Sequence, residues 1–100
     1  MKKTFSKTSV DCKVTFTISA DLLAGAKKAA VAGDFNDWNV EALPFKITKG
    51  AGSASISLPI GKEFQYKFVI DGTRWENDPE TEGYVSNGMG EYNSVVKTYK

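Results

Sequence analysis

The sequence predicts an all-β protein, an antiparallel β-sandwich of immunoglobulin type. Apolar and polar residues alternate along several short runs, such as 14–18 and 64–71, and these runs are rich in β-branched and aromatic residues. That alternation is typical of strands with one buried face. Turn-forming residues separate the runs, and no strand–helix–strand pattern occurs. About seven short strands at this spacing indicate two packed antiparallel sheets.

The expected strands can be placed in chain order. In the first, Val14, Phe16 and Ile18 face one side and threonines face the other. Alternating runs follow at 45–48, 55–58 and 64–71, and less regular strands are expected at 27–32 and 93–99. The turn signals between them are Gly33-Asp34, Gly50-Ala51-Gly52, Pro59-Ile60-Gly61, Asp71-Gly72 and Asp78-Pro79. A short helical turn is indicated at residues 21–26.

The run at 64–71 predicts which side chains form the core. Side chains alternate along a strand, so Lys67 must point away from the side that carries Tyr66 and Phe68. The residues expected to be substantially buried are Phe16, Phe64, Tyr66, Phe68 and Ile70. Lys67 is therefore expected on an exposed outer face, where the simplest interpretation of a lysine is a solvated surface residue.

The length of the chain indicates one domain. One hundred residues provide a single hydrophobic core, with no room for a second. Residues 1–11 are expected to form a polar, weakly ordered lead-in, and residues 12–100 are expected to form the sandwich. No internal repeat and no low-complexity tract is present in the sequence.

Composition argues against several classes of partner. Thirteen basic and twelve acidic side chains give a net charge of +1, which is too small to favour nucleic acid. No window is long and apolar enough to span a bilayer, so no membrane association is expected. Lys2 and Lys3 are not followed by the apolar stretch of a signal peptide, and Cys12 is the only cysteine. A cytoplasmic location is therefore expected.

The chain contains no histidine, which removes the commonest general base and the commonest metal ligand. Since there is only one cysteine, no metal site and no cofactor are expected either. The acidic residues within 76–82, Asp78 among them, lie in polar, turn-forming sequence. They are interpreted as solvated loop carboxylates, because a glycoside hydrolase needs a carboxyl group whose pKa is raised by burial. We therefore expect that the protein is not an enzyme.

Both tryptophans follow turn-rich sequence. Trp38 comes after residues 33–37 and Trp75 after residues 71–74, so both are expected in or beside loops. Position alone leaves two interpretations open: each ring anchors the core, or each ring stays at the surface as a binding platform. A pyranose ring can stack on a flat indole while its hydroxyls bond to nearby amides and ammonium groups. No comparable argument selects nucleotides or peptides.

Three ordered segments resemble one known family. They are Val31-Ala32-Gly33-Asp34-Phe35-Asn36-Asp37-Trp38, then Phe64-Gln65-Tyr66-Lys67-Phe68-Val69-Ile70-Asp71-Gly72 with Trp75 and Asp78-Pro79, then Asn87-Gly88-Met89-Gly90-Glu91-Tyr92-Asn93-Ser94-Val95-Val96. Together they resemble the glycogen-binding module of the AMP-activated protein kinase β subunit. They also resemble the modules that precede the catalytic barrels of isoamylases and branching enzymes, carbohydrate-binding module family 48. The resemblance extends over residues 12–98.

The resemblance implies an early-set immunoglobulin-like sandwich, not an enzyme, that binds α-1,4-linked glucan such as glycogen or starch chains. It implies that Trp38 and Trp75 stack on glucose rings and that Lys67 donates hydrogen bonds to sugar hydroxyls. It also implies that Met89 reaches across the sugar chain and that Asn93 contacts sugar. These five residues are the expected carbohydrate-binding site.

Two classes of function follow from these observations. The first is a carbohydrate-binding module for α-glucan, either free-standing or part of a larger protein. The second is a protein-interaction or regulatory sandwich domain that has lost sugar binding. The presence of both tryptophans, Lys67 and Asn93 favours the first, since packing alone would not require Lys67. The identity of any protein partner stays open.

Overall fold

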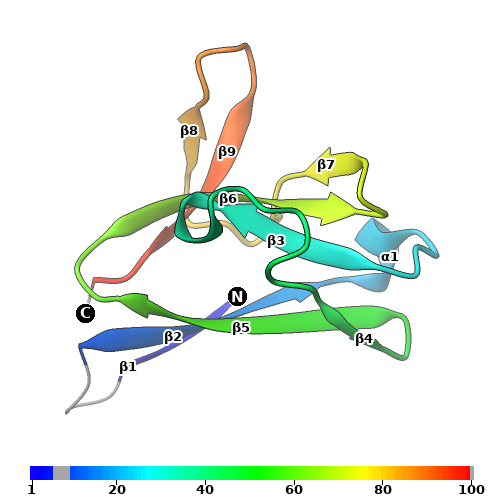
Figure 1. Cartoon of the computed structure of the whole chain (residues 1–100), viewed down its shortest axis with the longest axis horizontal. Coiled ribbons are helices and arrows are strands. Elements are labelled where there is room, and N and C mark those ends of the chain that lie inside the picture. Colours follow the sequence, from blue (N-terminus) through cyan, green and yellow to red (C-terminus); the bar gives the residue numbers. More distant parts are fainter. Residues whose placement is uncertain (6–9, 100) are drawn as a thin grey trace.

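The computed structural model describes residues 1–5 and 10–99, and the statements below concern these residues. They form two antiparallel sheets that face each other (Figure 1), so the predicted all-β sandwich is confirmed. The strands are β1 (Lys2–Phe5), β2 (Asp11–Ile18), β3 (Ala29–Gly33), β4 (Lys46–Thr48), β5 (Ala51–Pro59), β6 (Glu63–Ile70), β7 (Arg74–Glu76), β8 (Tyr84–Ser86) and β9 (Tyr92–Lys97). A short helix, α1 (Ala20–Leu23), and a 3₁₀ turn, η1 (Asp34–Asn36), complete the chain.

The first sheet has the strand order β1-β2-β5-β4 and forms the lower layer in Figure 1. Its central strands β2 and β5 are antiparallel along the whole of β2. Alternate side chains of β2 are buried, namely Cys12, Val14, Phe16 and Ile18. This is the period-two pattern that the sequence predicts, and it places the apolar side chains of one face of the sheet in the core.

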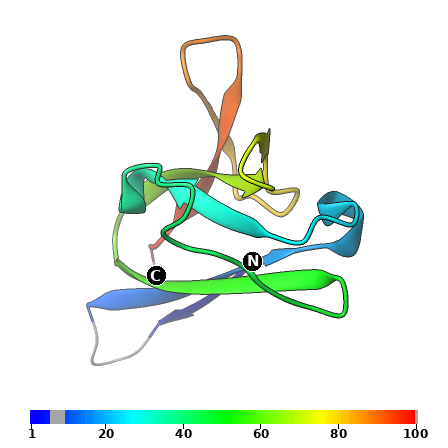
Figure 2. The same ribbon diagram turned by 45° about the vertical axis from the view of Figure 1, so that its right-hand side comes forward.

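The second sheet is organised around β6. One edge of β6 pairs with β3 over residues 66–70. Its other edge pairs with β9 over residues 63–66 and then with β7 over residues 68–70, so the neighbouring strand changes at Lys67. Beyond this point β9 leaves the sheet and pairs with β8 alone. The resulting hairpin projects from the sandwich in both Figure 1 and Figure 2.

Aromatic rings fill the space between the sheets. The ring of Phe16 lies 4.8 Å from that of Tyr66 and 6.5 Å from that of Phe68, measured between centroids. The predicted burial is confirmed for Phe16, Tyr66, Phe68 and Ile70. Phe64, also expected to be substantially buried, is half-buried, because it lies at the beginning of β6 and packs edge-to-face on Phe35 at the margin of the core.

The expectation of a weakly ordered lead-in is wrong for residues 2–5. They form β1, which pairs with β2 and packs Phe5 against the core. This strand was not predicted because its two lysines make the segment look polar. The ammonium group of Lys3 is in fact bonded to Glu82, so its charge is compensated within the fold. Residues 6–9 of the predicted lead-in lie outside the described residues.

The turn expected at Gly50-Ala51-Gly52 is shorter than predicted. Lys49 and Gly50 make the reversal at φ of 52° and 84°, and β5 already begins at Ala51. Gly52 therefore has a packing role. A Cβ at this position would lie 3.0 Å from Ile18 and 3.1 Å from Phe45, which is closer than nearly all real contacts of this kind.

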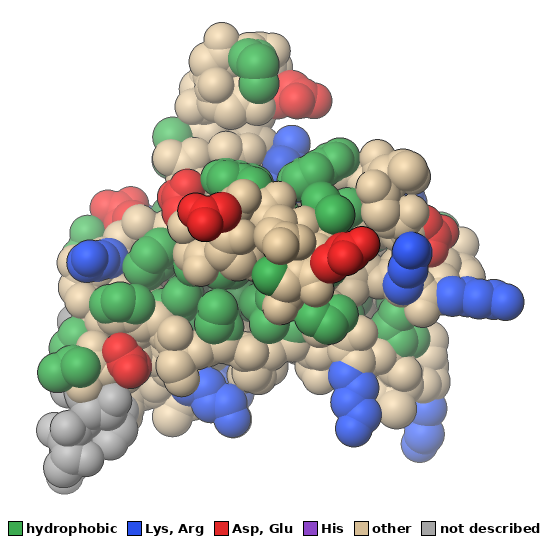
Figure 3. All heavy atoms as spheres, viewed as in Figure 1, with side chains coloured by type: hydrophobic (Ala, Val, Ile, Leu, Met, Phe, Trp, Pro, Cys, Tyr) green, Lys and Arg blue, Asp and Glu red, His purple; other side chains and the backbone are tan. Residues whose placement is uncertain are grey.

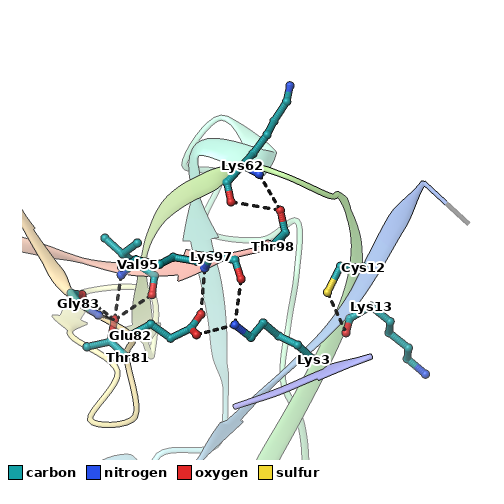
Figure 4. A network of polar contacts seen from close by, with 10 residues as sticks. All are labelled: Lys3, Cys12, Lys13, Lys62, Thr81, Glu82, Gly83, Val95, Lys97 and Thr98. Carbon is teal, nitrogen blue, oxygen red and sulfur yellow. Dashed lines mark hydrogen bonds and ion pairs between the residues drawn. The ribbon is translucent and has the colours of Figure 1, made fainter. Parts of the chain in front are cut away.

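Hydrogen bonds attach the base of the projecting hairpin to the rest of the fold (Figure 4). Thr81 Oγ1 accepts from the Val95 N–H at 2.8 Å, and Glu82 Oε1 accepts from the Lys97 N–H at 2.9 Å. Lys3 Nζ donates to Glu82 and to the Lys97 carbonyl. Burial alone would raise the pKa of Glu82, but the bonds from Lys3 and Lys97 hold this pKa below its usual range.

Candidate functional site

The loop after β3 determines the position of Trp38. Asp34 Oδ2 accepts from the Gln65 N–H at 2.9 Å, which attaches the loop to β6. The side-chain amide of Asn36 bonds back to β3 at both its oxygen and its nitrogen, each at 3.0 Å. Between them, Phe35 packs its ring against the core. Asp34 and Asn36 are therefore structural residues that fix the approach to Trp38.

The backbone of this loop is compact and strained. Trp38 has a φ of 58°, in the left-handed region, and its N–H donates to the Gly33 carbonyl at 2.9 Å. Such a conformation costs a bulky residue about 1–3 kcal/mol, so the loop bonds must hold it. Gly33 is required for the close approach of β3 to β6, since a Cβ here would lie 2.5 Å from the Gln65 carbonyl oxygen. The indole of Trp38 is half-buried.

The reversal after β6 places Trp75. Asp71 and Gly72 have φ of 55° and 76°, which makes the tight turn that the sequence predicts. Trp75 then lies on the short strand β7, directly beside this turn as expected, and is paired with Val69. Val69 and Lys67 share one face of β6, so Trp75 lies on the same outer face as Lys67. Its side chain is 42% exposed.

Lys67 points away from the core, as predicted, but it is not on an open surface. It is only 9% exposed, because the change of partner from β9 to β7 leaves it between the projecting hairpin and the two tryptophans. Among residues 1–5 and 10–99, its ammonium group has no hydrogen-bond or ion-pair partner. Neighbouring residues cover the aliphatic part of the Lys67 side chain and so restrict its motion. All three N–H donors of its ammonium group are unused.

The tip of the β8–β9 hairpin presents Met89. Asn87 closes the tip: its Oδ1 accepts from the N–H groups of Met89 (2.9 Å) and Glu91 (3.4 Å), and its own N–H donates to the Glu91 carbonyl at 3.0 Å. Gly88 and Gly90 flank Met89 at φ of 80° and 83°, a conformation that glycine adopts without strain. Met89 is 80% exposed, so its thioether is free to contact a bound molecule.

A chain of hydrogen bonds, here called the polar latch, holds the segment after β7 against β9. Asn77 Nδ2 donates to the Tyr92 carbonyl at 3.0 Å, and Asn77 Oδ1 accepts from Ser94 Oγ at 2.8 Å. The Asp78 N–H donates to Ser94 Oγ at 3.0 Å, and the Tyr66 hydroxyl donates to Asp78 Oδ2 at 2.7 Å. The polar latch therefore sets the spacing between β7 and the hairpin.

The interpretation of Asp78 as a solvated loop carboxylate is wrong. Asp78 is 1% exposed, because the latch draws it beneath the second sheet to the Tyr66 hydroxyl. Its other oxygen accepts from the Glu80 N–H at 2.9 Å. Both oxygens thus bind structural donors, so the burial of Asp78 serves the fold. Burial, followed by the hydrogen bond to Asp78, raises the pKa of Tyr66 far above its usual range.

The raised pKa of Tyr66 predicts a loss of stability in alkali. A folded-state pKa above the unfolded value gives stability that is complete below the unfolded pKa of about 10 and is lost as the pH rises above it. Tyr66 alone should lower the free energy of unfolding by up to about 1.4 kcal/mol per pH unit in that range. Urea unfolding from pH 9 to pH 11 measures this slope. Tyr66→Phe should reduce it, and an unchanged slope would contradict the prediction.

Asn93 lies on β9 just beyond its pairing with β6. Its Nδ2 donates to Gln65 Oε1 at 3.0 Å, which fixes the orientation of the amide. In the described part of the chain its Oδ1 and second N–H have no partner. An oriented amide with an unused acceptor and an unused donor suits a hydroxyl group, which can bond to both.

All five residues of the predicted site meet in one place. They line a hollow of about 520 Å³ on the outer face of the second sheet, here called the tryptophan hollow, whose lining residues are Trp38, Lys67, Trp75, Asn87, Met89, Glu91 and Asn93. Figure 3 shows hydrophobic side chains at the foot of the projecting hairpin and along the adjoining edge of the sandwich. Asn87 and Glu91 were not among the predicted contact residues, because the resemblance assigned sugar contacts only to Met89 and Asn93 in this segment.

Comparison with known proteins identifies the family of the chain. A family model described as the glycogen recognition site of AMP-activated protein kinase matches residues 15–100, which include all seven lining residues. The chain belongs to this family. It is accordingly a carbohydrate-binding module with the β-sandwich fold. No curated protein matches the chain.

The hollow of this glycogen-recognition module combines flat apolar rings with hydrogen-bonding groups of both kinds. Trp38 and Trp75 offer ring faces, Lys67 offers donors, and Asn93 offers a donor and an acceptor. Such a lining suits a ligand with apolar ring faces and a polar rim. Within residues 1–5 and 10–99 no group of three acidic or cysteine side chains could hold a metal ion. No helix in the same residues is long and apolar enough to cross a membrane.

Proposed function

We propose that the protein is a non-catalytic module that binds α-1,4-linked glucan in the tryptophan hollow. Trp38 and Trp75 stack on glucose rings, Lys67 and Asn93 bond to the hydroxyls, and Met89 lies across the sugar chain. We propose that it does so in the cytoplasm and that neither nucleic acid nor a membrane is its partner. The near-neutral charge of the chain supports this choice, since nucleic acid would need a strongly basic face.

One observation carries the proposal. The five residues come from the loop after β3, from β6, from β7 and from the hairpin, yet all line one hollow in a chain of the glycogen-recognition family. The core does not need Lys67 or Met89 there, since neither belongs to the buried apolar cluster. The strained backbone of Trp38 agrees with a binding role, because strain of this kind collects at functional sites.

The expected affinity is weak. Two indole faces remove on the order of 100–150 Å² of apolar surface from water, or about 3–4 kcal/mol. Hydrogen bonds from Lys67 and Asn93 add about 1 kcal/mol each. Ordering a flexible glucan offsets part of this gain, so the dissociation constant for a short oligosaccharide should lie between tens of micromolar and about 1 mM.

Titration calorimetry with maltoheptaose tests the proposal directly, with cellohexaose as the β-1,4-linked control. The native protein should bind maltoheptaose saturably and should show no saturable binding of cellohexaose. On resin, it should be retained by glycogen and pass through cellulose. Absence of saturable binding at millimolar maltoheptaose would refute the proposal.

Lys67 provides a second, finer test. Lys67→Met keeps the covered stem but removes the ammonium group, so it separates hydrogen bonding from packing. We expect maltoheptaose to bind about tenfold more weakly, the loss of one charged donor. The free energy of unfolding should not fall, because the ammonium group has no partner within the described residues. Unchanged affinity would remove Lys67 from the proposed contacts.

One observation supports the alternative of a protein-interaction domain. Tyr84 and Tyr92 lie on the face of the hairpin opposite to Asn93, and each is 56% exposed. Exposed tyrosines on one face are common at protein interfaces. This alternative replaces the glucan proposal if the titration with maltoheptaose gives no saturable binding.

A further inference from the structure

The tryptophan hollow is lined by two charges of opposite sign, Lys67 on β6 and Glu91 at the hairpin tip. The backbone of Glu91 is fixed, since its N–H and its carbonyl both bond to Asn87. Within residues 1–5 and 10–99, neither the carboxylate of Glu91 nor the ammonium group of Lys67 has a hydrogen-bond or ion-pair partner. The two groups therefore face one hollow without neutralising each other.

This pair of charges favours one kind of occupant. An ammonium group can only donate hydrogen bonds and an ionised carboxylate can only accept them, whereas a hydroxyl group does both. A neutral polyhydroxyl chain can therefore satisfy Lys67 and Glu91 together. An anionic ligand would be attracted by Lys67 but repelled by Glu91 across the same hollow. Without Glu91, a hollow whose only charge is Lys67 would favour anions.

We infer that Glu91 is a specificity-determining residue, which accepts hydrogen bonds from glucan hydroxyls and rejects glucan that carries phosphate monoesters. The inference rests on the proposed function of the same hollow and names its ligand class more narrowly, as uncharged glucan. A phosphate monoester carries a charge of about −1.5 to −2 at neutral pH. In a partly hydrated site, repulsion between the Glu91 carboxylate and a phosphate group should weaken binding of the phosphorylated glucan by roughly tenfold.

The experiment compares two ligands with the same sugar ring, and the Glu91→Gln variant separates the effect of their charge from that of their size. One is a cyclic α-1,4-linked heptasaccharide, and the other is the same ring with a phosphate on every 6-hydroxyl, so that no binding register avoids the charge. The readout is the ratio of the two dissociation constants at fixed ionic strength, for the native protein, Glu91→Gln and Glu91→Lys. Glu63→Gln is the matched control, since Glu63 carries an equal charge on an exposed part of β6 outside the hollow.

The native protein should bind the neutral ring more tightly than the phosphorylated ring, by less than the roughly tenfold effect of Glu91 alone because Lys67 offsets part of the repulsion. Glu91→Gln should reduce this ratio by roughly three- to tenfold, Glu91→Lys should reduce it further or reverse it, and Glu63→Gln should leave it at the native value. Equal binding of both rings by the native protein, or an equal effect of Glu91→Gln and Glu63→Gln, overturns the inference and leaves the proposed function standing. Failure of the native protein to bind the neutral ring overturns both.

Discussion

Trp75→Ala is expected to abolish detectable binding of maltoheptaose while leaving the fold intact. Removing one indole face takes away half of the stacking surface, or about 1.5–2 kcal/mol, which weakens binding by roughly 10–30-fold. Because the native affinity is itself weak, this loss places the dissociation constant beyond practical titration. Trp75 is 42% exposed on a short edge strand, so its truncation should change the free energy of unfolding by less than about 1 kcal/mol.

Tyr99→Ala is the matched control, since Tyr99 is 50% exposed and does not line the hollow. It should bind maltoheptaose as the native protein does. Calorimetry measures the binding and urea unfolding measures the fold of both variants. If Trp75→Ala unfolds the protein, the indole is a core anchor. If a folded Trp75→Ala still binds with native affinity, the stacking role is refuted.

Trp38→Ala should also abolish binding, with one difference. Trp38 is half-buried, so some loss of stability is expected, whereas the strain at its φ of 58° applies to alanine as well as to tryptophan and adds nothing to the difference. Trp38→Phe separates the two effects, because it keeps an aromatic ring at the same strained position. It should retain measurable binding and near-native stability.

The regular part of the fold could be predicted because alternation is a local signal. The runs around Val14–Ile18 and 64–70 specify their buried faces without reference to any partner, and β2 and β6 follow them. β1 was not predicted because its two lysines make it look polar although its burial alternates, and β8 was not predicted because all three of its side chains are exposed. Those strands depend on pairing with β2 and β9, which is a property of the whole fold.

The five residues proposed to bind glucan were predicted from the resemblance to a known family, and neither composition nor spacing selected them. The surroundings of these residues, meaning their burial and their neighbours, could not be predicted from the sequence. The covering of Lys67 results from the change of strand partner along β6, and the burial of Asp78 results from the latch to Ser94 and Tyr66. Glu91 joins the hollow through the closed hairpin tip. The first two depend on residues distant in sequence, whereas the place of Glu91 depends on the local closure of the hairpin tip by Asn87.

The largest expected effect on stability is that of Tyr66→Phe. This change removes the hydroxyl that donates to Asp78 Oδ2 and leaves a carboxylate that is 1% exposed with one donor fewer. Leaving a buried charged group without its partner costs about 2–4 kcal/mol, a large part of the stability of a domain this small. Urea unfolding at pH 7 measures the loss. Tyr99→Phe removes a hydroxyl bonded to exposed Glu63 and should cost less than about 0.5 kcal/mol.

The same change should act on the site, because Asp78 belongs to the polar latch that sets the distance of β7 from the hairpin. Tyr66→Phe should therefore weaken maltoheptaose binding although Tyr66 does not line the hollow. Asp78→Asn separates charge from contact, since the amide is neutral and its one oxygen can still accept from the Glu80 N–H. In the Tyr66→Phe background, Asp78→Asn should recover about 1–2 kcal/mol of the loss, because the remaining buried group is then uncharged. Equal unfolding free energies for Tyr66→Phe and Tyr99→Phe would show instead that the carboxylate of Asp78 does not depend on the Tyr66 hydroxyl.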